Sequence, residues 1–124
     1  MKNAVCVLIT DKDNNILSVS RKDNHNDWGL PGGKLDENES FIDAAIREAL
    51  EETGYSIEII DVSNYFECTD NDYLVRTYKA KIVSDLRIPV SNKETGIVSF
   101  RNKIDLLKGS FSEYNFNCFK HFKL

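Results

Sequence analysis

Short β-prone runs and one helical stretch divide the first half of the chain. Residues 4–10 are almost continuously apolar, which is typical of a central strand with both faces buried. Residues 16–20 form a shorter run, and the Asp/Asn cluster at 11–15 predicts a hairpin turn between the two. Residues 21–27 are polar and show no period, so they are predicted to form a loop.

Helical periodicity begins at residue 40. Ser40 and Asp43 form the S-x-x-D pattern of a capped helix start, and Gly54 is a natural stop, so a helix of about 13 residues is predicted. At about 100° per residue, one narrow apolar stripe should face the core. Its members are Ile42, Ala45, Ile46, Ala49 and Thr53.

Strand composition returns beyond this helix. The predicted strands are residues 56–60, 73–83 and 97–100. Polar residues 67–72 predict a hairpin loop, and Ile88-Pro89 predicts a loop that runs to about residue 95. Residues 103–108 and 111–122 are predicted helices, and the second carries an apolar stripe. The stripe consists of Phe111, Tyr114, Cys118, Phe119 and Phe122. This order of elements predicts an α/β/α sandwich on a mixed sheet.

Composition excludes several classes of protein. A length of 124 residues predicts a single domain over residues 1–124. With a net charge of −4, the chain lacks the excess of basic residues expected of a protein that binds duplex nucleic acid. Three cysteines without a C-x-x-C pair argue against a zinc site and a disulfide framework. The apolar run at 4–9 is too short for a signal peptide or membrane span. We therefore expect a cytoplasmic protein without a membrane partner, either monomer or homodimer.

Three glutamates gather on the predicted helix. Glu48, Glu51 and Glu52 fall within about 100° of arc, where like charges at i,i+3 and i,i+4 repel one another unless a cation lies between them. A hard divalent cation such as Mg²⁺ is the natural candidate. Taken alone, however, E-x-x-E-E is more often a solvated acidic face.

The surrounding residues change this balance. The pattern G-x5-E-x7-R-E-U-x-E-E-x-G-U is met by Gly33, Glu39, Arg47, Glu48, Glu51, Glu52 and Gly54. The segment from Gly33 to Tyr55 therefore resembles the Nudix box, and WGLPGG before it resembles the W-x-x-P-G-G lead-in typical of that family. Ala49 and Tyr55 depart mildly from the aliphatic positions of the box, which concerns packing rather than chemistry.

The resemblance implies a fold, a cofactor and a reaction. These are the Nudix α/β/α sandwich around a mixed, curved β-sheet, Mg²⁺ with Mn²⁺ as a substitute, and hydrolysis of a phosphoanhydride. The implied metal-site residues are Gly33, Glu48, Glu51, Glu52 and Glu94. Arg47 joins the catalytic set by pairing with a box carboxylate, and Gly32, Glu39 and Gly54 support it. The general base would be Glu48 or Glu94, although Glu94 is equally consistent with a loop surface charge.

Four further residues are candidates for binding the substrate. Arg21 stands where a family member would hold a substrate phosphate or base, and Lys34 could contact a phosphate, although solvated cations are equally consistent with the sequence. Trp28, at a loop-to-strand junction, could serve both the core and a binding surface. Asn115 stands near the start of the last helix, where some family members read the base, and a solvent-facing Asn is at least as consistent. Tyr73 stands roughly where the diadenosine-polyphosphate branch of the family carries a tyrosine. Because its strand is rich in β-forming residues, it is interpreted as a packing residue.

The leading hypothesis is a Mg²⁺-dependent hydrolase that cleaves a nucleoside triphosphate, ordinary or oxidised, to the monophosphate and pyrophosphate. The alternative substrates are a dinucleoside polyphosphate, ADP-ribose and the 5′ end of an RNA, the last being weakened by the acidic balance. A hypothesis of another class is a nucleotide-sensing module without catalysis. Such a module could lose its metal carboxylates, and this sequence keeps all of them.

Overall fold

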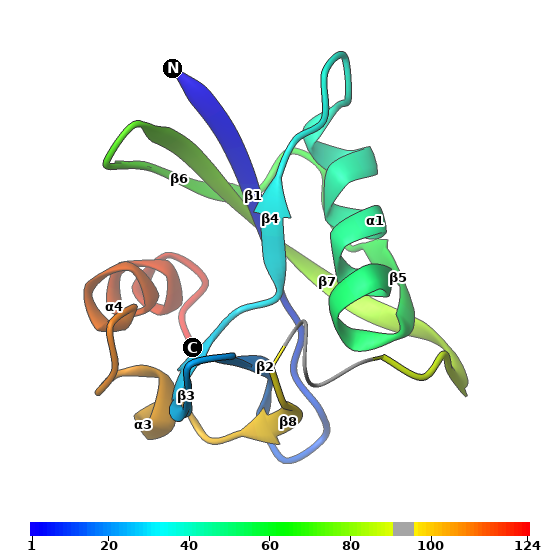
Figure 1. Ribbon diagram of the computed structural model, residues 1–124, viewed down its shortest axis with the longest axis vertical. Helices are drawn as coiled ribbons and strands as arrows, with labels where there is room; N and C mark the ends of the chain where they lie inside the picture. The colour runs from blue at the N-terminus through cyan, green and yellow to red at the C-terminus, as the bar shows by residue number, and fades with distance from the viewer. Residues whose placement is uncertain (91–95) are drawn as a thin grey trace.

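A five-stranded mixed sheet carries the long central helix on one face (Figure 1). The computed structural model describes residues 1–90 and 96–124. The strands of this sheet are β1 (Lys2–Leu8), β4 (Gly32–Lys34), β5 (Tyr55–Ile59), β6 (Tyr65–Asp70) and β7 (Tyr73–Arg87). The predicted central position of the first strand is confirmed, because β1 pairs in parallel with β7 and antiparallel with β4. The long β7 pairs with β1 and β6 along its first part and with β5 farther on.

A second, smaller sheet is antiparallel and has the order β3-β2-β8. Its strands are β2 (Ile16–Arg21), β3 (Asn24–Gly29) and β8 (Val98–Arg101). The predicted turn at 11–15 is present, and the Asp11 carboxylate accepts the backbone N–H groups of Asp13 and Asn15. The two flanking strands nevertheless enter different sheets, joined near the turn by a bridge between Thr10 and Ile16.

Two segments predicted to be loops are strands. Residues 24–27 belong to β3, which pairs with β2 through Arg21↔Asn24 and Ser20↔Trp28, so the loop predicted for 21–27 is reduced to a turn at 22–23 and the rest of that prediction was wrong. Residues 67–70 belong to β6, which pairs with β7 along its whole length. Both strands expose polar side chains, and their backbone pairing rather than apolar alternation holds them in the sheet. The turn between β6 and β7 is confined to Asn71 and Asp72.

The predicted 13-residue helix is confirmed as α1 (Phe41–Thr53). Ser40 accepts the Asp43 N–H at its start, and Gly54 ends it with φ 80° in the left-handed region. The buried face is rotated from the predicted stripe: Ala44 is buried, whereas Ile46 is 38% exposed. Small alanines let the helix lie close on the sheet, and this rotation turns Glu48 and Glu52 partly inward.

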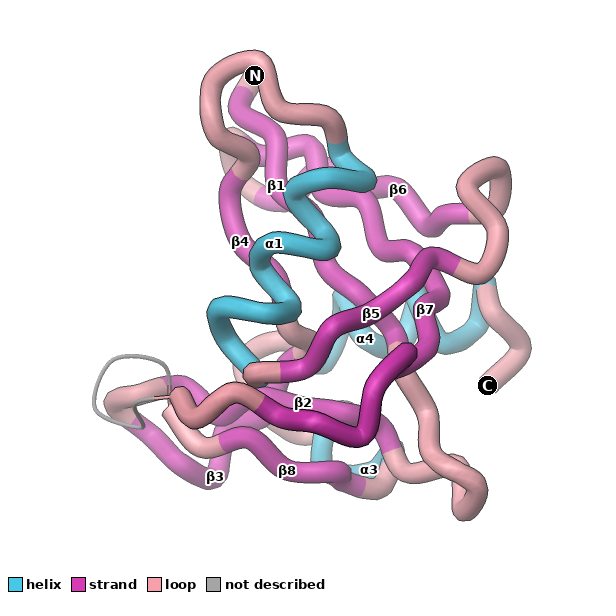
Figure 2. The backbone as a smooth tube through the Cα atoms, turned by 90° about the vertical axis from the view of Figure 1, so that its right-hand side faces the viewer, coloured by secondary structure: helices cyan, strands magenta, loops and turns pink. Residues whose placement is uncertain are grey.

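The opposite face of the large sheet is covered by the C-terminal helix α4 (Ser112–His121), whereas α3 (Lys103–Leu106) packs against β3 of the small sheet (Figure 2). Their core is a cluster of buried residues separate from the one under α1. This cluster contains Leu8, Ile16, Trp28, Leu106, Cys118 and Phe119. The predicted α/β class, with helices on both faces of a mixed sheet, is confirmed. None of the helices in the described parts of the chain has the length and apolar character needed to cross a membrane.

Candidate functional site

Arg47 is the centre of a carboxylate network on α1. Its Nε and Nη2 atoms donate to the two oxygens of Glu39 at 2.8 and 2.9 Å. Its Nη1 atom donates to Glu48 at 2.9 Å and to Glu51 at 3.1 Å. A fifth bond, from Nη2 to the Lys34 carbonyl at 3.1 Å, ties the guanidinium to β4. One planar cation therefore fixes three of the box carboxylates at once, as only the fork geometry of arginine allows.

The protonation of the box glutamates differs with their surroundings. The Arg47 guanidinium lowers the pKa of Glu39 to about 2. Burial raises the pKa of Glu52 to about 7, against the opposing effect of the Gly32 N–H, which donates to its Oε1 at 2.7 Å. Burial also raises the pKa of Glu48, and the bond from Arg47 opposes the shift. A raised carboxylate pKa means that burying the charge is unfavourable unless a cation is near.

Gly33 of β4 faces the Glu48 side chain of α1 at close range. A Cβ atom built on Gly33 would lie 2.5 Å from one carboxylate oxygen of Glu48 and 2.6 Å from the other. Any larger residue at this position would displace the Glu48 side chain. The glycine that opens the box is therefore explained by the space that the glutamate needs.

The carboxylates fit a hard divalent cation by the chemistry of their donor atoms. Within the described ranges, no three His, Cys, Asp or Glu side chains gather closely enough to hold a metal ion, and Glu48 and Glu51 share Arg47 instead. Carboxylate oxygens are nevertheless the ligands that Mg²⁺ prefers, and partly buried charge at Glu48 and Glu52 is what a cation would offset. Glu94, the other predicted ligand, lies outside the described residues.

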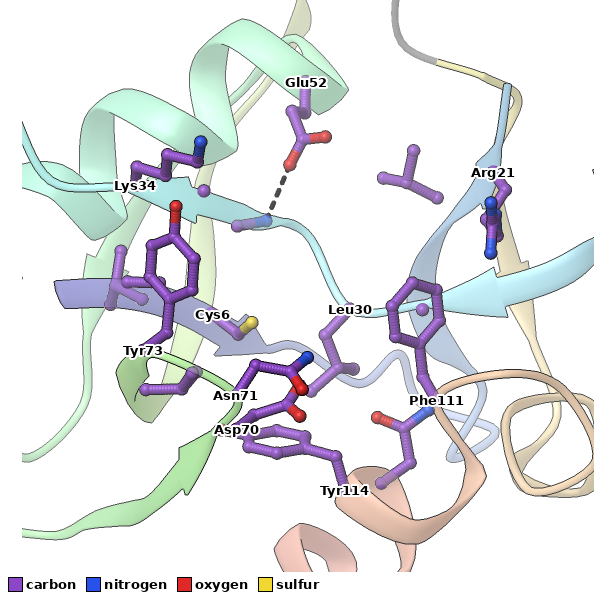
Figure 3. Close-up of a pocket in the computed structure, with 18 of the residues that line it drawn as sticks. Cys6, Arg21, Leu30, Lys34, Glu52, Asp70, Asn71, Tyr73, Phe111 and Tyr114 are labelled. Atoms are coloured by element: carbon purple, nitrogen blue, oxygen red, sulfur yellow. Dashed lines mark hydrogen bonds between the residues drawn. The ribbon is translucent and has the colours of Figure 1, made fainter. Parts of the chain in front are cut away.

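A pocket of about 400 Å³ opens beside these carboxylates (Figure 3). Its wall combines residues of both sheets, of the β6–β7 turn and of the start of α4. Glu52 reaches it from α1, and Lys34 stands beside the Tyr73 ring with its Nζ 5.6 Å from the ring centroid. Figure 3 shows Tyr73 on one side of the pocket and Phe111 on the other, with Leu30 between them.

The structure brings three of the four predicted substrate residues to this pocket. Arg21 lines it and is also paired with Asp23 through two bonds of 2.9 Å. Lys34 lines it as well. Asn115 lines it and is only 1% exposed, so the solvent-facing alternative was wrong; its amide donates to the Leu106 carbonyl at 2.9 Å.

Trp28 is placed elsewhere. Its ring is 5% exposed within the core under α4, and the Arg101 guanidinium lies 4.6 Å from the ring centroid. Among the residues that the structure describes, the pocket wall does not include it, so its interpretation as a binding residue is not supported. The indole ring therefore contributes to the packing of the core and not to the pocket.

Several lining residues were not predicted from the sequence. Asp70 reaches the pocket from the end of β6 and Asn71 from the β6–β7 turn. Tyr114 reaches it from α4, and Phe111 is the residue that precedes α4. Phe111 was placed in the buried stripe of the last helix, yet its side chain is 41% exposed. The signal was its position before the helix start, where the helical period no longer fixes the direction of a side chain.

Comparisons with known proteins bear on the family and the fold of this chain. A family model described as the NUDIX domain matches residues 1–105. The putative 8-oxo-dGTP diphosphatase of Bacillus subtilis (strain 168) is 50% identical over 50 residues, which are 40% of this chain and 33% of that protein. The RNA pyrophosphohydrolase of Pelagibacter ubique (strain HTCC1062) is 37% identical over 62 residues, which are 48% of this chain and 39% of that protein. The match thus spans between 33% and 39% of the length of these two relatives.

A solved structure of a Caenorhabditis elegans Ap4A hydrolase, in a binary complex, superimposes with a TM-score of 0.78. The alignment covers 97% of this chain and 95% of that one at 20% sequence identity. At that identity, the likeness establishes the shared fold.

Proposed function

Because this chain belongs to the NUDIX domain family, we propose that it is a Mg²⁺-dependent hydrolase of a phosphoanhydride bond in a nucleoside diphosphate-linked substrate. The favoured substrate is a nucleoside triphosphate, ordinary or oxidised, which gives the monophosphate and pyrophosphate. The observation that carries the proposal is that Glu52 of the box opens onto a pocket shared with the cations Arg21 and Lys34. The name of the Bacillus relative, a putative 8-oxo-dGTP diphosphatase, supports the choice of substrate.

Each box residue has a distinct role in this proposal. Glu48, Glu51, Glu52 and the Gly33 carbonyl would hold the metal, and Arg47 would keep the carboxylates in place. When bound, Mg²⁺ would neutralise phosphate charge and lower the pKa of water. Glu48 would accept a proton from the attacking water, a role favoured by its raised pKa.

Cations at the pocket would balance the remaining charge of the substrate. The chain has a net charge of −4, so its overall field opposes a polyphosphate. Lys34, the second residue of the box, would contact phosphate directly. Arg21 would have to exchange its bonds with Asp23 for bonds to the substrate. The same cations suit either an ordinary or an oxidised base, so they select for phosphate rather than for the base.

Turnover and product analysis test the proposal. The protein is incubated with Mg²⁺ and a panel of nucleoside triphosphates, oxidised nucleotides, ADP-ribose and dinucleoside polyphosphates, and phosphate is separated from pyrophosphate. We expect pyrophosphate from a triphosphate, and loss of turnover in Glu51→Gln and Glu52→Gln. Glu58→Gln is the matched control, since Glu58 is exposed on β5. Nucleotide binding without turnover by the unaltered protein would instead identify a sensing module.

A second candidate substrate is the 5′ end of a triphosphorylated RNA. It is favoured by the RNA pyrophosphohydrolase of Pelagibacter ubique among the relatives. The acidic balance of this chain weakens it, because binding of a nucleic acid backbone draws on basic residues. Competition between a triphosphorylated oligonucleotide and the free triphosphate decides the matter: kcat/KM higher for the oligonucleotide would replace the favoured substrate.

A further inference from the structure

The Phe111 ring forms an aromatic wall of the pocket. Phe111 lines it with a side chain that is 41% exposed. Its ring lies against the backbone of β3, where a Cβ atom on Gly29 would come within 2.9 Å of the ring. Gly29 is buried and its lack of a side chain is what allows this contact. The ring is therefore seated on one side and open to the pocket on the other.

The loop that carries this ring is held by a buried carboxylate. Asp27 is 7% exposed, and its Oδ1 accepts the Ser110 N–H at 3.0 Å while its Oδ2 accepts the Ser110 hydroxyl at 2.6 Å. A Cβ atom on Gly109 would collide with the same carboxylate. Bonds to a buried charge are among the stronger hydrogen bonds in proteins. Asp27 thus fixes the residue next to Phe111 across 83 positions of sequence.

The ring also stands apart from the catalytic carboxylates. Glu52 enters the pocket from α1, whereas Phe111 enters from the opposite helical layer, just before α4 (Figure 3). A substrate whose phosphates lie near Glu52 and Lys34 would extend its other end toward Phe111. A planar apolar face at that end suits a planar aromatic ring, since such rings stack favourably on phenylalanine.

We propose that Phe111 is the stacking surface for the base of the substrate, and that Asp27 positions it through Ser110. The inference rests on the proposed function in one respect, namely that the substrate is a nucleotide. Stacking tolerates any base, because every base has an aromatic face. Phe111 therefore contributes affinity for the nucleoside part as a whole and leaves the choice of base to other residues of the wall.

Phe111→Ala tests the stacking surface by equilibrium binding, measured by calorimetry with a nucleoside monophosphate and, separately, with inorganic pyrophosphate. We expect affinity for the monophosphate to fall by about 5- to 100-fold, the range for loss of one base–aromatic stack, while pyrophosphate affinity stays within about twofold. Phe111→Tyr should retain most of the affinity. The matched control is Phe116→Ala, because Phe116 is a phenylalanine on the adjoining helix α4, is 58% exposed and lies away from the pocket wall among the described residues.

Asp27→Ala tests the positioning role by comparison with Phe111→Ala. We expect weaker monophosphate binding with unchanged pyrophosphate binding, and Asp27→Asn should restore most of it because an amide oxygen can still accept the Ser110 N–H. In the double variant, Asp27→Ala should add little to the loss caused by Phe111→Ala. Fully additive losses would show that Asp27 acts on the fold in general and would overturn this role.

Binding and turnover together separate this inference from the proposed function. If the unaltered protein hydrolyses a triphosphate and Phe111→Ala binds the monophosphate as tightly as before, the stacking role is overturned and the function stands. Equal losses for monophosphate and pyrophosphate would also overturn it, because pyrophosphate has no base. If the unaltered protein binds the monophosphate through Phe111 without any turnover, the hydrolase proposal fails and the stacking role stands.

Discussion

Arg47 shows how one residue organises the site. Its guanidinium binds Glu39 through two parallel bonds and reaches Glu48 and Glu51 with the third nitrogen. Like charges on one turn of a helix would otherwise repel one another. The pairing raises the pKa of Arg47 further above its usual range and holds the pKa of Glu39 low, so both stay charged at neutral pH.

Replacing Arg47 by lysine should expose this role. Lysine keeps the charge but is a point donor that cannot span Glu39 and Glu48 together. We expect Arg47→Lys to lower kcat/KM by about 10- to 100-fold, and to require more Mg²⁺ for half-maximal activity. Activity assays over a magnesium titration provide the measurement. An unchanged profile would mean that charge alone suffices at this position.

Glu52 should make stability depend on pH and on metal. Its pKa is raised by burial to about 7 in the folded protein, against an ordinary value of 4.5, so the folded state holds its proton more tightly than the unfolded chain. Stability is therefore lost as pH rises from about 4.5 through 7, where the buried group becomes charged. Without metal at pH 8, Glu52→Gln should be more stable than the unaltered protein by on the order of 1 to 3 kcal/mol.

Thermal melts with chelator at pH 5 and pH 8 measure this effect. The difference in Tm between Glu52→Gln and the unaltered protein should shrink at pH 5, where the carboxyl is protonated in the folded state. Added Mg²⁺ at pH 8 should stabilise the unaltered protein more than the variant, because binding to the folded state alone raises stability. A variant that melts lower at both pH values would contradict the assignment of a buried, unfavourable charge.

At the scale of elements, the features that depend on contiguous sequence were the ones that could be predicted. The start of α1 at Ser40, its end at Gly54 and the box residues between them were all predicted from contiguous sequence. Strands β3 and β6 were not, because their polar residues are held by pairing with β2 and β7, which the local sequence does not display. The rotation of α1 was also missed, since packing of small alanines against the sheet overrode the amphipathic pattern.

The end of α1 allows a test of backbone geometry. Gly54 has φ 80°, and a Cβ atom there would collide with the Ile88 carbonyl. Gly54→Ala should lower the free energy of unfolding by about 2 kcal/mol or more, because strain in the left-handed region adds to the collision. Asn38→Ala is a control at φ 64° where a Cβ atom is already accommodated. Denaturant titrations should show a clearly larger loss for Gly54→Ala than for the control.

At the scale of the whole molecule, the pocket is a product of tertiary structure. Arg21, Tyr73 and Phe111 come from three distant segments that meet only when both sheets and α4 are assembled. Sequence motifs therefore identified the helix that carries the candidate metal-binding carboxylates but could not identify the aromatic wall. Asn115 illustrates this limit of sequence analysis. Its position near the start of the last helix suggested a binding role, whereas its burial and its hydrogen bond to the Leu106 carbonyl depend on the fold.

Two thiols, the buried Cys118 and the partly buried Cys6, should report the opening of this assembly. Burial raises the pKa of both Cys6 and Cys118 to about 12, so neither forms much thiolate at pH 8 in the folded state. Alkylation of these two residues, followed by mass spectrometry, should be slower than in the denatured chain by orders of magnitude and should accelerate in Gly54→Ala. Rapid modification of Cys118 in the unaltered protein would contradict its burial.

The parallel pairing of β1 with β7 also affects how the chain folds while it is being synthesised. Lys2 pairs with Tyr73 and Leu8 with Lys79, so about 70 residues separate the partners. A ribosome adds ~5–20 residues per second, so the first strand emerges several seconds before the strand that flanks it. Helix α1 and the whole box are completed in that interval. The edge of the N-terminal strand that faces β7 must therefore wait unpaired during translation, although β4 can already pair with its other edge, and this open edge would benefit from chaperone protection.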